Sequence, residues 1–398
     1  MTTRNGLAID GGTPVRTAPF PRGQEVGPEE EAALISVLRS GHWGSSSGSE
    51  VREFESEFAA FQEAPHATAV ANGTLALVAA LRAIGVKPGD EVIVPPYTFI
   101  ASASAVVLAG AVPVFADVDP ETMLLDAAAV SDAVTERTVG IMPVHIGGRP
   151  CDMDAITALA RQRGLFVLED AAQATGAEWR GRKTGTIGDL GTFSFQSSKI
   201  LTAGEGGIIT TADDALADLV WSMANVGRIR GGGWYQHEFI AFNLRMTEFQ
   251  GALLRSQLRR YPAQALRRSA SAARLDEGLS AIAGVRVPPA DDRVTAHSHA
   301  LYTFRLPPGT DKPRFLAAVR AEGIPAEAGY VSLNRIPVLL HAAREASGRS
   351  GLEFDACPVS AEIESDVIWL HHNVLLGEER DIDDVVLAVR KVLGVDHG

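Results

Sequence analysis

The chain has 398 residues, of which 46% are hydrophobic and 21% are charged, and its formal net charge is −13. This composition is typical of a globular protein and excludes a disordered one, while the length predicts two domains. The negative charge argues against a general nucleic-acid binder, because such proteins need a cationic surface to displace counterions. A local basic pocket for a small anion remains compatible with it.

The cysteines and the apolar stretches exclude further classes of protein. Cys151 and Cys357 lie far apart and form no CxxC pair, so we expect neither a disulfide scaffold nor a zinc or other metal site. The opening residues, MTTRNGLAIDGGTPVRT, contain no apolar signal-peptide core. The most apolar long stretch, residues 100–118, is too short and too rich in alanine and serine for a membrane span, and it predicts a buried helix followed by a buried strand. We therefore expect a cytoplasmic protein without a membrane partner.

Helices alternate with short apolar strands through the first two thirds of the chain. Phenylalanines recur at helical spacing in residues 53–64, and residues 72–85 predict a helix that begins at Asn72 and Gly73. A further helix, residues 152–164, begins at Asp152 and ends at Gly164. The expected strands are residues 90–96, 111–118, 140–147, 165–170, 191–195 and 206–211. This alternation is typical of an α/β domain whose parallel sheet is covered on both faces.

The last third of the chain has a different pattern. Residues 246–284 predict a long helix, broken at Pro262, which joins the two domains. A strand at 300–307 and helices at 311–325 and 384–394 then indicate a smaller α+β domain. We place the large domain at residues 1–265, including an N-terminal arm of about 25 residues, and the small domain at residues 266–398.

Three positions are candidates for a ligand site, and each has an ordinary alternative. Asp170 ends a strand, where open α/β sheets bind ligands, but it could be an exposed loop acid. Gly73 and Thr74 open a helix whose free N–H groups favour phosphate, but NGT is also a common helix start. Lys199 follows a strand and precedes GEGG, so it is either solvated or used covalently.

Together these residues fit the chemistry of pyridoxal 5′-phosphate. Such an enzyme needs a lysine for the Schiff base, an acid at the pyridine nitrogen and a cup for the phosphate. The acid keeps the ring protonated, so the ring withdraws electrons from the carbanion formed at the substrate's α-carbon. The released lysine then moves the proton between this carbon and the cofactor.

Seven segments carry a family resemblance. In chain order they are ANGTLAL, VIVPPYTFIAS, PVFADVDPET, IMPVHIGG, LEDAAQATGA, TFSFQSSKILTAGEGG and FNLRMTEFQGALL. By these motifs the chain resembles the DegT/DnrJ/StrS family of sugar and cyclitol aminotransferases over almost its whole length. The resemblance implies fold type I of the pyridoxal phosphate-dependent transferases: a mostly parallel central sheet flanked by helices, followed by a smaller C-terminal α+β domain.

The resemblance also implies a role for each site residue. The cofactor would be bound covalently by Lys199, at its ring nitrogen by Asp170 and near its ring hydroxyl by Gln173. Phe99 would stack on the ring, unless it is a plain core aromatic. The phosphate would be held by Gly73, Thr74 and Ser194.

One implied contact comes from a second chain. Asn243, in FNLRMTE, would reach the phosphate from the neighbouring subunit, which makes the working unit at least a homodimer with shared active sites. Arg245 and Glu248 in the same motif are interpreted as structural.

Two departures from the family pattern bear on the substrate. Relatives with histidine in place of the lysine dehydrate ketosugars, so Lys199 favours transamination. SGHWGSSSG and DVIWLHHNVLLG resemble the glutamine-dependent inosose aminotransferases and the 3-amino-5-hydroxybenzoate synthases. Candidate substrate residues are His42, Trp43, Arg228, His371, His372 and Asn373. The paired histidines could instead be structural, and they do not suit zinc, because adjacent side chains point in different directions.

The sequence therefore predicts a pyridoxal phosphate-dependent aminotransferase. L-glutamine or L-glutamate would donate nitrogen, and a keto-cyclitol or ketosugar of secondary metabolism would accept it. One alternative is a lyase like 3-amino-5-hydroxybenzoate synthase, and another is a nucleotide-ketosugar aminotransferase that uses Arg228 and Arg230. A regulator that keeps the fold is disfavoured by the intact Lys199, Asp170 and Ser194. A nicotinamide dehydrogenase is disfavoured because no G-x-G-x-x-G links a strand to a helix.

Overall fold

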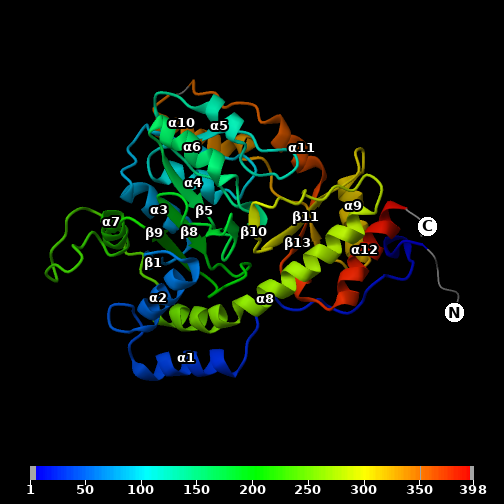
Figure 1. Ribbon diagram of the computed structural model, residues 1–398, viewed down its shortest axis with the longest axis horizontal. Helices are drawn as coiled ribbons and strands as arrows, with labels where there is room; N and C mark the ends of the chain where they lie inside the picture. The colour runs from blue at the N-terminus through cyan, green and yellow to red at the C-terminus, as the bar shows by residue number, and fades with distance from the viewer. Residues whose placement is uncertain (1–5, 350, 395–398) are drawn as a thin grey trace.

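A seven-stranded sheet forms the centre of the large half of the molecule (Figure 1). The computed structural model describes residues 6–349 and 351–394. The strand order is β1-β9-β8-β5-β4-β2-β3, and β9 alone runs antiparallel to its neighbours. The strands are β1 (His66–Val70), β2 (Glu91–Val94), β3 (Val112–Phe115), β4 (Thr138–Ile141), β5 (Phe166–Asp170), β8 (Leu190–Ser194) and β9 (Gly207–Thr211).

Helices cover both faces of this sheet because successive side chains of each strand point to opposite sides. In β5, for example, Leu168 packs into one hydrophobic cluster and Val167 into another. The first face is covered by α3 (Gly73–Ala83), α4 (Ala101–Leu108) and α7 (Asp214–Ala224). The second is covered by α2 (Glu50–Gln62), α5 (Ala127–Ala133) and α6 (Met153–Arg163). The predicted α/β architecture is confirmed.

The small half is built on a three-stranded antiparallel sheet in the order β11-β13-β12. Its strands are β11 (Leu301–Arg305), β12 (Ala326–Glu327) and β13 (Val367–His371), and α9 (Lys312–Ala321) and α12 (Glu379–Leu393) pack around a separate core. A second small sheet contains β6 (Glu178–Trp179), β7 (Arg182–Lys183) and β10 (Val294–Ala296). The remaining helices are α1 (Pro28–Ser40), α10 (Pro337–Ser347) and α11 (Pro358–Asp366).

The long helix α8 (Glu248–Ser280) runs from the large half to the small half. The predicted break at Pro262 is wrong, because the helix has 33 residues in all and is continuous through this proline. Proline removes one hydrogen bond and its ring crowds the preceding turn, but Pro262 is exposed while Tyr261 beside it is buried. The axis changes direction partway along (Figure 1), as expected for a helix that accommodates proline by bending. A domain boundary at 265 stays a prediction.

The N-terminal arm, described from residue 6, lies across the small half. Arg16 pairs with Asp381 at 2.5 Å and with Asp384 at 3.1 Å, both on α12. The Glu322 carboxylate at the end of α9 accepts the backbone N–H groups of Ala8 and Val15 at 2.8 and 2.9 Å. Further along, the side chain of Gln24 donates to the carbonyl of Ser197 in the large half. The arm thereby connects the small half to the loop that carries Lys199.

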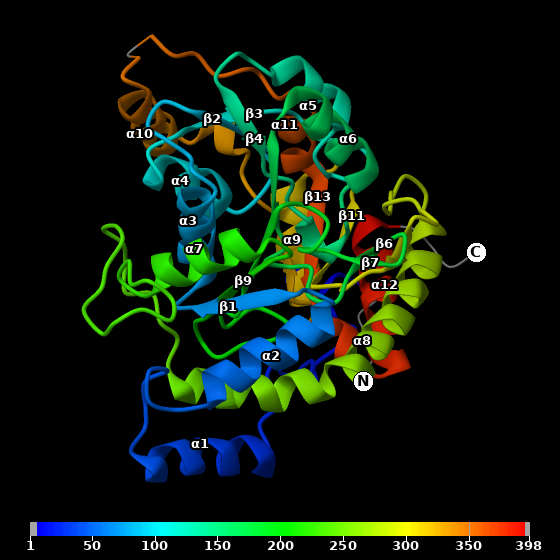
Figure 2. The ribbon, with the colours of Figure 1, turned by 60° about the vertical axis from the view of Figure 1, so that its left-hand side comes forward.

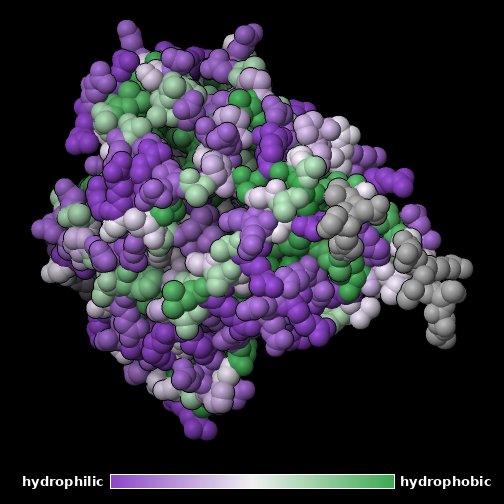
Figure 3. Space-filling model, turned by 45° about the vertical axis from the view of Figure 1, so that its right-hand side comes forward, coloured by the Kyte–Doolittle hydropathy of each residue, from purple (hydrophilic) through white to green (hydrophobic). Residues whose placement is uncertain are grey.

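The hydropathy of the surface varies between regions of the molecule. One face is mostly hydrophilic, with smaller hydrophobic patches between the charged residues (Figure 3). The segment that follows α7 projects from the body in both ribbon views (Figures 1 and 2), and its Trp234, Tyr235 and Ile240 are exposed. Within residues 6–349 and 351–394, no helix combines the length and the apolarity that a membrane span requires.

Candidate active site

A cavity of about 680 Å³ lies where β5 and β8 end and α3 begins. Ligands of open α/β sheets bind at this edge, beyond the carboxyl ends of the parallel strands. The small half contributes one aromatic residue to the wall. The polar and aromatic lining consists of Asn72, Thr74, Thr98, Phe99, Asp170, Gln173, Thr192, Phe193, Ser194, Gln196, Ser198, Lys199, Glu205 and Tyr330.

Lys199 enters this cavity from the turn that follows β8. Its backbone N–H donates to the carbonyl of Gln196 at 2.9 Å, which closes the turn. Within the described part of the chain, its amine makes no hydrogen bond or ion pair, although it lines the cavity. Burial lowers the pKa of this amine, and the negative charge of Asp170 opposes the shift. A lysine without a polar partner in a sheltered cavity has the character of a nucleophile rather than of a surface cation.

Asp170 ends β5 and is only 5% exposed. One carboxylate oxygen accepts the hydroxyl of Ser102 at 2.7 Å, and the other accepts the N–H of Ala172 at 3.2 Å. Burial raises the pKa of this carboxyl, while the two hydrogen bonds and the Lys199 charge pull it down. The two donors fix the direction of the carboxylate, which suits it to hold a cation or an N–H group in the cavity.

The side-chain amide of Gln173 lies beside these two groups. Its oxygen accepts the N–H of Gly147 at 2.6 Å, and its nitrogen donates to the phenol oxygen of Tyr330 at 2.9 Å. Gln173 therefore links the large half to the small half at the wall of the cavity.

The start of α3 forms the anion-binding end of the cavity. Asn72 caps the helix by accepting the N–H of Leu75 at 2.9 Å, as the sequence predicted. A Cβ atom on Gly73 would lie 2.7 Å from the Cβ of Ser194, so only glycine lets the helix approach β8 this closely. The free N–H groups of the helix start and the Ser194 hydroxyl together suit a phosphate.

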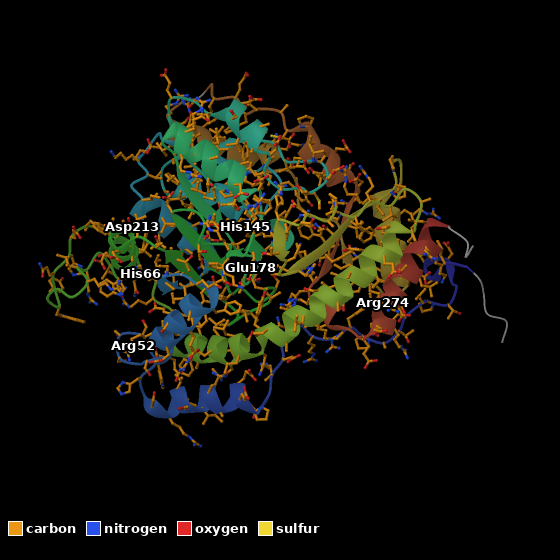
Figure 4. All side chains as sticks on the ribbon, viewed as in Figure 1. Arg52, His66, His145, Glu178, Asp213 and Arg274 are labelled. Atoms are coloured by element: carbon orange, nitrogen blue, oxygen red, sulfur yellow. The ribbon has the colours of Figure 1, made fainter. Side chains whose placement is uncertain are left out.

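Beneath the cavity, Glu169 and His145 support the strand ends. Glu169 is fully buried and accepts the N–H groups of Gly185, Ile187 and Gly188 at 2.7–2.8 Å. The His145 ring, in the interior of the large half (Figure 4), lies 2.9 Å from Glu169 through Nε2 and accepts the Cys151 N–H through Nδ1. Because a backbone amide can only donate, the ring proton is on Nε2, facing Glu169.

The structure thus brings seven predicted cofactor residues to one cavity. They are Gly73, Thr74, Phe99, Asp170, Gln173, Ser194 and Lys199. Phe99 is 54% exposed, so its ring has a free face, and its centroid is 6.2 Å from that of Tyr330. The eighth, Asn243, is exposed and does not line the cavity of its own chain. Glu248, interpreted as structural, accepts the N–H groups of Glu50 and Val51 at the start of α2.

The predicted substrate residues lie outside the lining of this cavity. His42 and Trp43 are exposed beyond α1, and Arg228 lies over the ring of Trp234 at 4.3 Å in the projecting segment. His371 lies 3.3 Å from Glu327, and Asn373 donates to the carbonyl of Pro21 at 2.9 Å. His372 is buried, 3% exposed, so the two adjacent histidines do face different surroundings.

Two residues that position groups of the site, Ser102 and Tyr330, were not predicted. Ser102 orients Asp170 from α4, and the available signal was the pair of serines in an otherwise apolar helix, ASASAVVL. Tyr330 comes from the small half, 157 residues beyond Gln173, so no local pattern could place it there.

The chemical types of these groups and their positions around the cavity fit pyridoxal 5′-phosphate. One cavity is lined by an amine without a partner, a buried carboxylate held in one direction, and a helix start with a nearby hydroxyl. An exposed aromatic face borders it. Fold and cavity together define a pyridoxal phosphate-dependent transferase of fold type I.

The comparisons with known proteins place the chain more narrowly. It belongs to the DegT/DnrJ/EryC1/StrS aminotransferase family, whose model matches residues 24–390. It is 39% identical to L-glutamine:2-deoxy-scyllo-inosose aminotransferase of Streptomyces paromomycinus, covering 98% of each chain. It is 40% identical to 3-amino-5-hydroxybenzoate synthase of Amycolatopsis mediterranei, covering 92% of this chain and 96% of the relative.

A solved structure agrees with this placement. The crystal structure of a 3-amino-5-hydroxybenzoic acid synthase superposes with a TM-score of 0.88 at 37% identity, covering 96% of this chain and all of the other. The expected family, fold type and aminotransferase class are therefore confirmed, and so is the dependence on pyridoxal phosphate.

Proposed function

We propose that this aminotransferase moves the amino group of L-glutamine, or of L-glutamate, to a keto-cyclitol in the biosynthesis of an aminocyclitol secondary metabolite. The observation that carries this proposal is the cavity in which Lys199, Asp170 and Gln173 meet. The choice of substrates follows the relatives named L-glutamine:2-deoxy-scyllo-inosose aminotransferase, at 37–39% identity over nearly full length.

Pyridoxal phosphate, when bound, withdraws electrons from the amino-bearing carbon of the substrate. Gly73, Thr74 and Ser194 would hold its phosphate, and Asp170 would keep its ring nitrogen protonated. Lys199 would hold it covalently and, once released, carry a proton at its amine. The lowered pKa of Lys199 favours this role, because it increases the fraction of the neutral amine, which is the form that accepts a proton.

The charged side chains that line the cavity indicate which class of amino acceptor it suits. Among the residues that line it, Lys199 is the one cationic side chain, whereas Asp170 and Glu205 are acidic. A nucleotide diphosphate would bring two further negative charges and needs cations beside it. An uncharged cyclitol ketone suits this lining better, although Arg228 and Arg230 of a second chain could change the balance.

The holoenzyme provides the test. L-glutamine alone should convert the bound pyridoxal phosphate to its pyridoxamine form, followed by its absorption spectrum, and keto-cyclitols should then restore the original spectrum. Nucleotide ketosugars should restore it slowly or not at all. An unchanged spectrum with both glutamine and glutamate would contradict an aminotransferase.

A lyase like 3-amino-5-hydroxybenzoate synthase is the second candidate, supported by the 40% identity to that enzyme. Mass spectrometry of the product separates the two functions. Retention of all hydroxyl groups indicates amino transfer, and loss of water indicates elimination.

We also propose that the working unit is a homodimer in the cytoplasm, with Asn243 of each chain at the phosphate of the other. Asn243 does not line the cavity of its own chain, is exposed and pairs with Asn225 just after α7, which is consistent with a contact in a second chain. The projecting segment after α7 carries Arg228, and His42 and Trp43 are exposed, so these candidates would act on substrate across the interface. His371 and Asn373 remain candidates at the small-domain side, whereas a structural role is proposed for the buried His372. The domains would divide near residue 265.

Mixing two inactive variants tests the shared site. A heterodimer of Lys199→Ala and Asn243→Ala chains would contain one site with both residues intact. Random mixing in equal amounts should then restore about a quarter of the wild-type activity. No restoration would place Asn243 in its own chain's site, and an Asn243→Ala variant that is active by itself would place Asn243 outside any site.

A further inference from the structure

Tyr330 is the point at which the small half reaches the cavity wall. It follows β12, and its ring packs edge-on against Trp369 with centroids 4.3 Å apart. The Tyr330 N–H lies 3.4 Å from the phenol oxygen of Tyr97. A Cβ atom on Gly329, whose φ is +82°, would lie 2.6 Å from the same oxygen, so only glycine allows this turn. The position of Tyr330 is therefore closely determined by its surroundings.

The hydrogen bonds of Gln173 have one consistent orientation. The N–H of Gly147 can only donate, so the Gln173 atom 2.6 Å from it must be the amide oxygen. The amide nitrogen consequently faces Tyr330, whose oxygen lies 2.9 Å away and accepts one of its two N–H groups. The second N–H remains for an acceptor in the cavity that Gln173 lines.

Tyr330 stays a neutral phenol throughout the physiological range, because burial raises its pKa to about 12. It can therefore accept from Gln173 without a change of charge. Without this acceptor, the amide would be held by Gly147 alone, and the whole group could rotate about that single bond.

We propose that Tyr330 is a positioning residue, which fixes the Gln173 amide so that its second N–H is directed at the ring oxygen of the cofactor. The proposal rests on the proposed function, because that role of Gln173 belongs to it. It adds that the protonation equilibrium of the bound cofactor depends on a contact between the small half and the large half.

The pH titration of the bound cofactor's visible absorption provides the test, with no amino donor or acceptor present. A neutral N–H donor stabilises the more negative form of the ring oxygen, so loosening it should move the midpoint to higher pH. For Tyr330→Phe we expect a shift of about 0.5 pH units, since a full hydrogen bond to a charged group would give about one unit or more. Gln173→Ala should shift the midpoint in the same direction by more.

Tyr302→Phe is the matched control, because it deletes a buried phenol oxygen of the small half, hydrogen-bonded to Asp276, without touching Tyr330 or Gln173. It should leave the midpoint unchanged. The double variant Tyr330→Phe/Gln173→Ala should titrate like Gln173→Ala alone, because Tyr330 acts only through that amide.

An unshifted Tyr330→Phe midpoint, an equal shift in Tyr302→Phe, or additive shifts in the double variant would each overturn the proposal. Failure of the proposed function would look different, because a protein that binds no pyridoxal phosphate shows no titration at all. Thermal unfolding of each variant checks that it is folded. If Tyr330→Phe is less stable, comparison of Gln173→Ala with the double variant still tests the proposal, because Tyr330→Phe should not shift the midpoint further there.

Discussion

Two pairs of titratable side chains in this molecule have pKa values shifted by burial, and only one of these pairs lines the cavity. Lys199 and Asp170 line the open space at the strand ends. Arg268 and His372, between α8 and β13, are 0% and 3% exposed and do not line that space. Burial and the nearby Arg268 charge lower the pKa of His372 to about 3. A shifted pKa therefore marks burial, and access to a ligand is what separates a reactive group from a structural one.

The strongest way to test this contrast is to remove the amine. Lys199→Ala should lower kcat by at least about 10⁴-fold, because it deletes both the covalent attachment and the proton carrier. The visible absorption of the covalently bound cofactor should disappear as well. Lys183→Ala is a suitable control, since Lys183 pairs with Glu178 at 2.7 Å outside the cavity. Retention of the wild-type spectrum by Lys199→Ala would refute the assignment.

Removal of the opposing charge should have the next largest effect. Asp170→Asn keeps the shape but not the negative charge, so we expect cofactor binding to weaken and kcat to fall about 10²–10³-fold. Steady-state kinetics and a cofactor titration measure the two effects. Near-normal turnover would exclude Asp170 from the ring nitrogen.

A smaller effect is expected from the hydroxyl that orients Asp170. Ser102→Ala removes a 2.7 Å hydrogen bond to the carboxylate, which should lower kcat about tenfold and raise the pKa of Asp170 further. Activity should then fall at a higher pH than in the wild type as the medium is acidified. Identical acidic limbs of the two pH profiles would argue against this link.

The buried histidine should affect stability rather than turnover. His372 has a folded-state pKa of about 3, below the ordinary 6.5, so it binds a proton more readily when unfolded. Its contribution is complete above pH 6.5 and is lost as the pH falls toward 3, by up to about 1.4 kcal/mol per pH unit. Urea unfolding of wild type and His372→Gln between pH 7.5 and 4.5 should show a smaller acid loss in the variant. Equal losses would contradict this interpretation.

The sequence could predict those parts of the structure that depend on local patterns, and not those that depend on contacts between distant segments. Six strands of the central sheet were predictable because each is a short apolar run, and Asp170 ends one such run while Lys199 lies in the turn after another. β1 was not predicted, because HATAV is short and weakly apolar and is defined by its pairing with β9. The break expected at Pro262 did not occur, because packing along α8 outweighs the loss of one hydrogen bond.

The site divides in the same way. The residues proposed to bind the cofactor come from motifs in a fixed order, so the family resemblance could propose a role for each of them. Tyr330 and the neighbours of His372 depend on contacts between distant segments, and a linear pattern holds no information on such contacts. The predicted substrate residues fall in the same group, because their surroundings are set by loops and by a second chain.

The N-terminal arm has a mechanical consequence. It is anchored to α9 and α12 through Glu322 and Arg16, and its other end is attached at Ser197, two positions before the lysine. Rotation of the small half would therefore pull on the turn that carries Lys199. A tether of this kind would make the position of the Lys199 amine depend on whether the two halves are close together.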